Sequence, residues 1–446
     1  MDRFIKIIRT LVLFIMIVWG TAWLTWRGMT TPPRERNLIE NSMVKLGEAP
    51  AEAIRYIRTD REHLEKGFGE REGLLRMGEL PEEKTVAADL YLLHYRYLGK
   101  NRGEVWLQNI QNGEIAWKWN IPLEKVYEDI RSMGREFDRR YREGKFVTHF
   151  DNYMTRNIEA LNIHSPVMMP DSSLYFNCIL GYIYKLDKNS NLLWRSERLA
   201  HHSIEPDSAG NIWTCSVDPD NKMANRYGFR DDAILALTPD GKEHFFRSLT
   251  DIFESNALLE EAIFSTQSLK AVCGFDPYHI NDVLPVGEDG IVWKKGDLML
   301  SLRHQSMVVV YRPQNDSIVW YRKGPWLTQH DIHIHNDSVF SVFNNNAWFD
   351  GILDKGSDIA FHNIVTGESW FRYSGIFRSP SNGRQNWLAD GRLLVEETDR
   401  SRYYLFDSDE KLMVQFYIPY RKNSENGQYP GWGRLYLKRE QRFEIQ

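Results

Sequence analysis

The sequence predicts an all-β fold, a six-bladed β-propeller, preceded by an N-terminal transmembrane helix and a short helical stalk. Three features lead to this prediction: a repeated strand–turn–strand unit, a high aromatic content and an apolar segment near the N-terminus. Aromatic residues make up 13% of the 446 residues, with 15 Trp and 21 Tyr. This content favours strands, because aromatic side chains fit the pleated, half-buried surface of a sheet.

The apolar segment covers residues 10–26, which carry no charged side chain. Crossing a bilayer takes about 20 mostly apolar residues, and apolar residues before position 10 supply the remainder. Three tryptophans lie where an interfacial aromatic belt would be, at Trp19, Trp23 and Trp26. The rival is a cleaved signal peptide with its cleavage site near Gly20. We favour an uncleaved anchor over residues 1–30, because the apolar stretch continues past that site.

Charge alone does not give the orientation, because the basic residues before the apolar core are balanced by those after it. The basic flank directly before the core resembles a signal-anchor, which would place the rest of the chain on the periplasmic or extracytoplasmic side of the membrane. Residues 31–88 are expected to form a linker and a helical stalk. They begin with Pro32 and Pro33 and become rich in Glu, Arg and Leu. Apolar residues then recur at helical spacing, at Ile54, Ile57, Leu64 and Phe68.

Residues 89–446 are expected to form the propeller. An outer hairpin with an Asn, Asp or Gly turn occurs six times. Each copy ends in an aromatic residue: Trp117, Trp194, Phe246, Trp320, Trp370 and Phe416. These residues are about 50 or about 75 positions apart, and the longer gaps contain helical insertions at 122–144 and 248–265. A period near 50 with four strands per unit is typical of propeller blades. The final strand, near Arg434, is expected to close the ring on the first blade.

Composition excludes two classes of protein. The net charge of -5 and the pI near 6.3 argue against a nucleic-acid partner, because such domains usually carry a basic surplus. The cysteines Cys178, Cys215 and Cys273 are far apart and odd in number, so they form neither a metal motif nor a disulfide framework. We expect them to be small buried apolar residues.

Four histidines begin the first strand of a blade: His164, His202, His279 and His330. The innermost strands line the central channel, so equivalent positions of different blades converge in space. Imidazole is the side chain whose ordinary pKa lies nearest neutrality, which suits nucleophilic and acid–base work. Arg303 begins the next strand of the His279 blade, and its planar guanidinium matches a tetrahedral oxyanion.

The segments DPYHIND, SLRHQS, WLTQHDIHIHNDSVFSVFNNN and GRQNWLADGRLLVEETDRSRYYLFD together resemble the bacterial arylsulfate sulfotransferases, which are six-bladed propellers. The resemblance covers about 162–416. It implies sulfuryl transfer from an aryl sulfate donor to a phenolic or other hydroxyl acceptor, without an activated nucleotide donor and without a cofactor or metal. The interval between His279 and Arg303 is longer than is usual in that family.

The resemblance also implies roles for single residues. His330 would be the nucleophile that forms a sulfohistidine intermediate. Arg303 and His279 would bind the sulfuryl oxygens, and His202 would assist there or protonate the leaving phenolate. Further substrate-binding residues would be His164, His201, His304 and Asn281.

Three alternatives remain open. A metal could be bound by His330, His333 and His335 with His304 or Asp331, although in a strand His330 points opposite to the other two. The NGEIAW and TGESWF turns are similar to quinoprotein dehydrogenase repeats. Finally, the chain could be a catalytically inactive, membrane-anchored scaffold with a protein partner in an envelope assembly, such as one for polysaccharide, because fold does not determine function.

Overall fold

The computed structural model describes residues 74–80, 87–142, 158, 161, 163–178, 180–264, 276–348, 353–354, 356–418 and 431–438. The chain divides into one unit of Phe68–Ala224 with Phe229–Gln446 and another of Met1–Gly67 with Asn225–Gly228. The expected anchor, residues 1–30, lies outside the described residues, as do most of the expected stalk and Cys273. Within the described part, no helix is long and apolar enough to cross a membrane.

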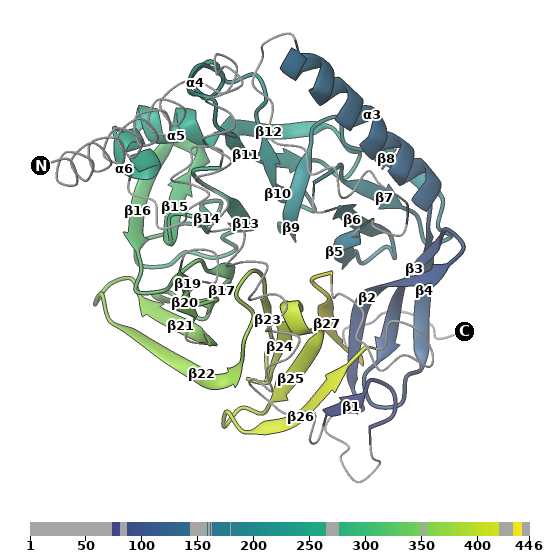
Figure 1. The fold of residues 1–446 in the computed structure, drawn as a ribbon. Coiled ribbons are helices and arrows are strands. Elements are labelled where there is room, and N and C mark those ends of the chain that lie inside the picture. The colour runs from purple at the N-terminus through teal and green to yellow at the C-terminus, as the bar shows by residue number, and fades with distance from the viewer. Residues whose placement is uncertain are drawn as a thin grey trace, which may run out of the picture. The chain divides into compact units, whose positions relative to one another are not determined.

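The larger unit is an all-β, six-bladed propeller, which confirms the propeller part of the predicted fold (Figure 1). Each blade contains four antiparallel strands. The first blade contains β27 (Arg434–Leu437), β2 (Leu90–Gly99), β3 (Arg102–Asn109) and β4 (Ile115–Ile121). The second contains β5 (Ile163–Met168), β6 (Leu174–Cys178), β7 (Tyr184–Leu186) and β8 (Leu192–Arg195). The third contains β9 (Ala200–Pro206), β10 (Ile212–Val217), β11 (Asp232–Leu237) and β12 (Glu243–Ser248).

The fourth blade contains β13 (Ile280–Pro285), β14 (Leu298–Leu302), β15 (Met307–Arg312) and β16 (Ser317–Lys323). The fifth contains β17 (His330–Ile334), β18 (Val339–Asn344), β21 (Ser357–Asn363) and β22 (Ser369–Phe377). The sixth contains β23 (Arg384–Trp387), β24 (Leu393–Glu397), β25 (Arg402–Phe406) and β26 (Leu412–Tyr417). A separate hairpin joins β19 (Ala347–Trp348) to β20 (Leu353–Asp354).

The ring is closed by the C-terminal strand, as predicted. β27 pairs with β2, with Leu437 opposite Leu90, and the Lys438 amide donates to the Asp89 carbonyl oxygen at 2.8 Å. Figure 1 shows this yellow strand beside the blue strands of the first blade. The first blade therefore takes its innermost strand from the far end of the chain.

One part of the expected helical stalk is instead a strand. β1 (Leu74–Arg76) pairs in parallel with β26 and extends the last blade to five strands. Met77 and Leu80 pack in the same apolar cluster as Phe416, so this segment is held by burial against the blade edge.

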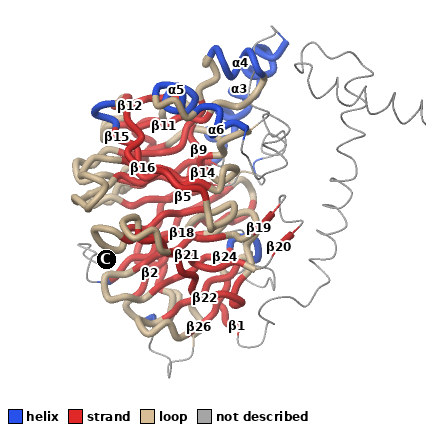
Figure 2. The backbone as a smooth tube through the Cα atoms, turned by 90° about the vertical axis from the view of Figure 1, so that its left-hand side faces the viewer, coloured by secondary structure: helices blue, strands red, loops and turns tan. Residues whose placement is uncertain are grey.

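The predicted helical insertions lie on the outside of the ring. They form α3 (Leu123–Arg142), α5 (Leu249–Ser255) and α6 (Leu259–Phe264). In α3, apolar residues three to four positions apart pack on the first two blades, namely Val126, Ile130, Met133 and Phe137. α5 is capped by the Ser248 hydroxyl and contacts β11, β12 and β16 (Figure 2). The other helices in the described part of the chain are α4 (Lys222–Tyr227), η3 (Pro313–Asn315) and η5 (Thr398–Arg400). Cys178 and Cys215 are buried and free, as expected.

Candidate functional site

The innermost strands share an unusual backbone feature where they begin. A residue with positive φ lies at or next to each axial histidine: Ser165 (47°), His202 (56°), His279 (49°) and Asp331 (46°). In all four blades the pairing register also shifts there, for example between His330 and Ile332. Such bulges change the direction of side chains, so the side chains of neighbouring residues need not point to opposite faces of the sheet.

These strand ends bring the four histidines together. The His202 ring centroid lies 5.2 Å from that of His279 and 6.3 Å from those of His164 and His330. Trp432, next to β27, completes the cluster, with its ring 4.9 Å from His164, 6.1 Å from His202 and 6.0 Å from His330. Residues more than 250 positions apart thus share one site.

His330 presents an unpaired nitrogen. Its Nδ1 lies 2.7 Å from Oδ1 of Asn345. The Asn345 amide group donates to the carbonyl oxygens of Ser379 (2.5 Å) and Asn382 (2.8 Å), so Oδ1 must face His330 and Nδ1 must carry the proton. Nε2 is buried and has no hydrogen-bond partner among the described residues. Burial, helped by the charge of Arg303, lowers the pKa of His330 to about 3. The result is a neutral imidazole with its lone pair on Nε2.

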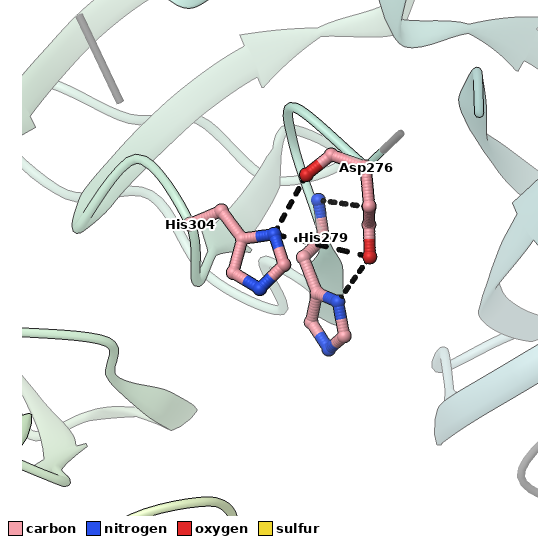
Figure 3. Close-up of side chains that lie close together, drawn as sticks. All are labelled: Asp276, His279 and His304. Carbon is pink, nitrogen blue, oxygen red and sulfur yellow. Dashed lines mark hydrogen bonds and ion pairs between the residues drawn. The ribbon is translucent and has the colours of Figure 1, made fainter. Parts of the chain in front are cut away.

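A carboxylate holds two further histidines (Figure 3). Nδ1 of His279 donates to Oδ2 of Asp276 at 2.5 Å, and Nδ1 of His304 donates to the Asp276 carbonyl oxygen at 2.6 Å. Both Nε2 atoms point away from Asp276. Burial raises the pKa of Asp276, but Arg230 and the two imidazoles outweigh it and hold that pKa well below its usual range.

Arg230 links this carboxylate to a second one. Its Nη2 lies 3.4 Å from Oδ1 of Asp276, and its Nε donates to Oδ1 of Asp232 at 2.7 Å. Asp232 lies 3.6 Å from Nε2 of His201. Nδ1 of His201 in turn lies 2.7 Å from Nδ1 of His202. His201 is therefore buried behind His202, which is itself only partly buried.

The remaining predicted site residues lie in the same region. The Arg303 amide donates to the His279 carbonyl oxygen at 3.0 Å, and its side chain is buried. Asn281 is fully buried and donates to the Gln329 carbonyl oxygen at 2.8 Å, which ties it to the residue before His330. His164 contacts the His202 carbonyl oxygen through Nδ1 at 3.3 Å, and burial lowers its pKa to about 3.

The metal alternative proposed from sequence is not supported by the geometry. His333 and His335 lie against Trp387, whereas His330 contacts His202 and Trp432. Among the described residues, Asp276, His279 and His304 do carry possible ligand atoms within 4.8 Å of one another. However, Arg230 already supplies a positive charge to Asp276, and both histidines donate protons towards that residue, so the arrangement fits a hydrogen-bonded carboxylate better than a metal centre.

Several site residues were missed by the sequence analysis: Arg230, Asp232, Asp276, Asn345 and Trp432. Asp276 begins the DPYHIND segment, so its position three residues before His279 was an available signal. Asn345 lies in the closing NNN of the segment that contains His330, so it had a similar signal. Trp432 had none, because it reaches the site from the C-terminal segment.

Fold and site define a class: six-bladed propellers with a histidine cluster where the innermost strands begin. The chain belongs to the arylsulfotransferase (ASST) family, which matches residues 171–419, more than half of its length. Family membership indicates a function of the arylsulfotransferase type. No curated protein sequence matches the chain.

Three solved structures show a limited similarity to this chain, each at low identity. A protein of unknown function from Bacteroides caccae is 12% identical, with a TM-score of 0.45 over 78% of this chain and 98% of that chain. A protein in a nidogen/laminin complex is 10% identical, with a TM-score of 0.41 over the same shares, 78% and 98%. A streptogramin B lyase is 13% identical, with a TM-score of 0.35 over 58% of this chain and 69% of that chain.

Proposed function

We propose that this protein transfers a sulfuryl group from an aryl sulfate to a phenolic or other hydroxyl acceptor through a sulfohistidine at His330, without an activated nucleotide donor. The observation that carries the proposal is the unpaired, buried Nε2 of His330, whose lone pair is fixed by the Asn345 hydrogen bond. A neutral imidazole divides one difficult transfer into two easier ones.

In the first half-reaction, Nε2 attacks sulfur. The N–S bond forms as the bond from sulfur to the aryl oxygen breaks, and the electron pair leaves on that oxygen, which takes a proton from His202. In the second half-reaction, His202 accepts the proton of the acceptor hydroxyl, whose oxygen attacks sulfur, and the electron pair of the N–S bond returns to His330.

Arg303 and His279 bind the sulfuryl oxygens in this proposal. His279 does so as an imidazolium, because its Nδ1 proton is already donated to Asp276 and Nε2 must carry a second proton to act as a donor. Negative charge spread over three oxygens needs fixed cationic or N–H donors, as in phosphoryl transfer. The buried guanidinium of Arg303 supplies such a charge close to His330. The substrate-binding roles of His164, His201, His304 and Asn281 stay predictions.

The test incubates the purified full-length protein with 4-nitrophenyl sulfate and a phenol. We expect nitrophenol release that depends on the phenol, and a sulfuryl adduct on His330 by mass spectrometry. His330→Ala should lose both. The matched control is His333→Gln, in the same strand but outside the cluster, which should retain both. Absence of the adduct and of phenol-dependent release from the native protein would instead favour the catalytically inactive scaffold.

We further propose that residues 1–30 anchor the chain, with the propeller on the periplasmic or extracytoplasmic side. The support is the uncharged segment 10–26 and the basic residues before it. The native chain should stay in the membrane fraction after alkaline extraction, and a protease added outside the cytoplasmic membrane should digest the propeller. Release by alkali, or protection from that protease, would contradict the placement. An envelope protein partner would co-purify with the anchored chain after cross-linking.

A further inference from the structure

The hydrogen bonds of His201 fix the position of one proton. Its Nε2 lies 3.1 Å from the Ser216 carbonyl oxygen and 3.6 Å from Oδ1 of Asp232. A carbonyl oxygen only accepts hydrogen bonds. Asp232 is fully buried and accepts from Arg230 and from the Ile280 amide at 2.8 Å, so it too acts as an acceptor. Nε2 of His201 is therefore the donor in these contacts and carries the ring proton.

The contact between the two rings leaves one proton to be shared. Nδ1 of His201 and Nδ1 of His202 are 2.7 Å apart, so one must donate to the other. In the neutral pair, His201 has already used its proton on Nε2. His202 then donates from Nδ1, and its own Nε2 carries a lone pair. Adding one proton to that Nε2 allows the shared proton to move to His201, which becomes an imidazolium.

The surroundings favour the charge on His201. Asp232 lies beside His201, whereas the rings next to His202 are the imidazoles of His164, His279 and His330. The backbone makes the pairing possible, because consecutive strand residues normally point to opposite faces. The positive φ of His202, 56°, breaks that alternation.

We propose that His201 and His202 form a proton relay, with Asp232 and Arg230 as its positioning residues. In the first half-reaction, Nε2 of His202 gives its proton to the departing aryl oxygen while the shared proton moves from His201 to His202. In the second, the acceptor hydroxyl gives its proton to Nε2 of His202 and the shared proton returns. In this relay His201 acts through His202 and touches no substrate, which replaces the substrate-binding role predicted for it from the sequence. This inference rests on the proposed sulfuryl transfer.

The test uses His201→Gln, whose side-chain oxygen can still accept from His202 and whose amide group can still donate to Ser216. The glutamine keeps His202 in place but cannot store a proton. General acid catalysis typically contributes about 100-fold or more, and it matters most for a poor leaving group. The first half-reaction with phenyl sulfate should therefore slow by about 100-fold or more, whereas that with 4-nitrophenyl sulfate should change only a few-fold. Equal losses for both donors, or no loss for either, would overturn the relay.

A second measurement does not depend on turnover. Nitrogen NMR of the native protein, labelled at histidine and assigned with His201→Gln, should show His201 protonated at Nε2 alone when no anion is bound. Adding inorganic sulfate should give the signature of an imidazolium at His201. A charge that resides on His202 in the sulfate complex would overturn the relay even if sulfuryl transfer occurs. Conversely, a native protein that forms no His330 adduct but shows the His201 imidazolium would contradict the transfer while confirming that the added proton resides on His201.

Discussion

At the scale of single residues, the site depends on which ring nitrogen carries the proton. Asn345 determines this for His330, because its amide group is oriented by two carbonyl oxygens in the segment between β22 and β23. The protonation state of the nucleophile therefore depends on this neighbour as much as on the His330 side chain itself.

Replacing Asn345 with Leu should slow the first half-reaction. A buried donor left without its acceptor costs about 1–3 kcal/mol, which corresponds to a loss of about 5- to 150-fold in rate. The rate should fall because the proton of His330 can then move to Nε2, while KM for the donor should change little. Single-turnover release of nitrophenol measures the effect, and urea unfolding checks the fold. A large rise in KM at an unchanged rate would show that Asn345 acts on binding instead.

Anion binding should tighten as the pH falls. Burial and then the neighbouring imidazoles, His201 foremost, hold the pKa of His202 well below its usual value, so it is neutral in the free protein near pH 7. A bound sulfate favours the charged form, so binding takes up a proton. The association constant should then rise by up to about tenfold per pH unit for each proton taken up, until the pKa of His202 in the free protein is reached.

Calorimetry in two buffers of different ionisation enthalpy measures this proton uptake directly. An uncharged phenol provides the control, since its binding should not take up a proton between about pH 5 and 7. Sulfate binding that is independent of pH over this range would mean that the histidines stay neutral in the complex.

At the scale of elements, the bulges at the strand starts determine the site. An L-residue with left-handed backbone costs about 1–2 kcal/mol, and such strain collects at functional sites. His202 carries this strain at φ 56°, and His201, directly before it, does not have a positive φ. The pair therefore offers a matched comparison within one strand.

We predict that His202→Gly is more stable than His202→Ala by about 1 kcal/mol, because glycine accepts a positive φ without strain. At His201 the order should reverse, since glycine normally weakens a strand by about 0.5–1 kcal/mol relative to alanine. Urea unfolding of the four variants measures both differences. The same order at both positions would exclude backbone strain as the cause.

The elements themselves were largely predictable from sequence, and the bulges were not. Alternating apolar residues and Asn, Asp or Gly turns indicate hairpins wherever they occur, and α3 follows from apolar residues at helical spacing. The strand β1 was expected to be helical, because its three residues carry too little pattern to oppose the charged segment before them. The positive φ of His202 depends on packing across the channel, which local sequence does not contain.

At the scale of the whole molecule, ring geometry explains why the histidines could be predicted and their partners could not. Equivalent blade positions converge in any closed propeller, so a histidine at the start of several inner strands is an informative pattern. Arg230 and Asp232 reach the site from the third strand of a blade or just before it, and Trp432 reaches it from the C-terminal segment. Their contribution to the site can therefore be recognised only in the closed ring.

The buried residue Glu396 contributes both to the closure of the propeller ring and to the integrity of the site. Its carboxylate accepts from the amides of Gly433 at 2.9 Å and Trp432 at 3.3 Å, immediately before β27. Burial raises the pKa of Glu396 to about 7. Trp432 also packs on three of the axial histidines. The segment that closes the ring therefore also contacts the histidines of the site.

Glu396→Ala should therefore weaken the fold and the site together. Two buried amides lose their acceptor at about 1–3 kcal/mol each, so the free energy of unfolding should fall by about 2–6 kcal/mol. Sulfate binding should weaken in the same variant, because Trp432 is no longer held against the histidines. Glu396→Gln keeps one acceptor oxygen and should lose less, and exposed Glu288→Ala should change stability by less than about 0.5 kcal/mol. If Glu396→Ala destabilised the protein but bound sulfate as tightly as the native chain, closure and site would be independent, and Trp432 would lie beside the histidines without supporting them.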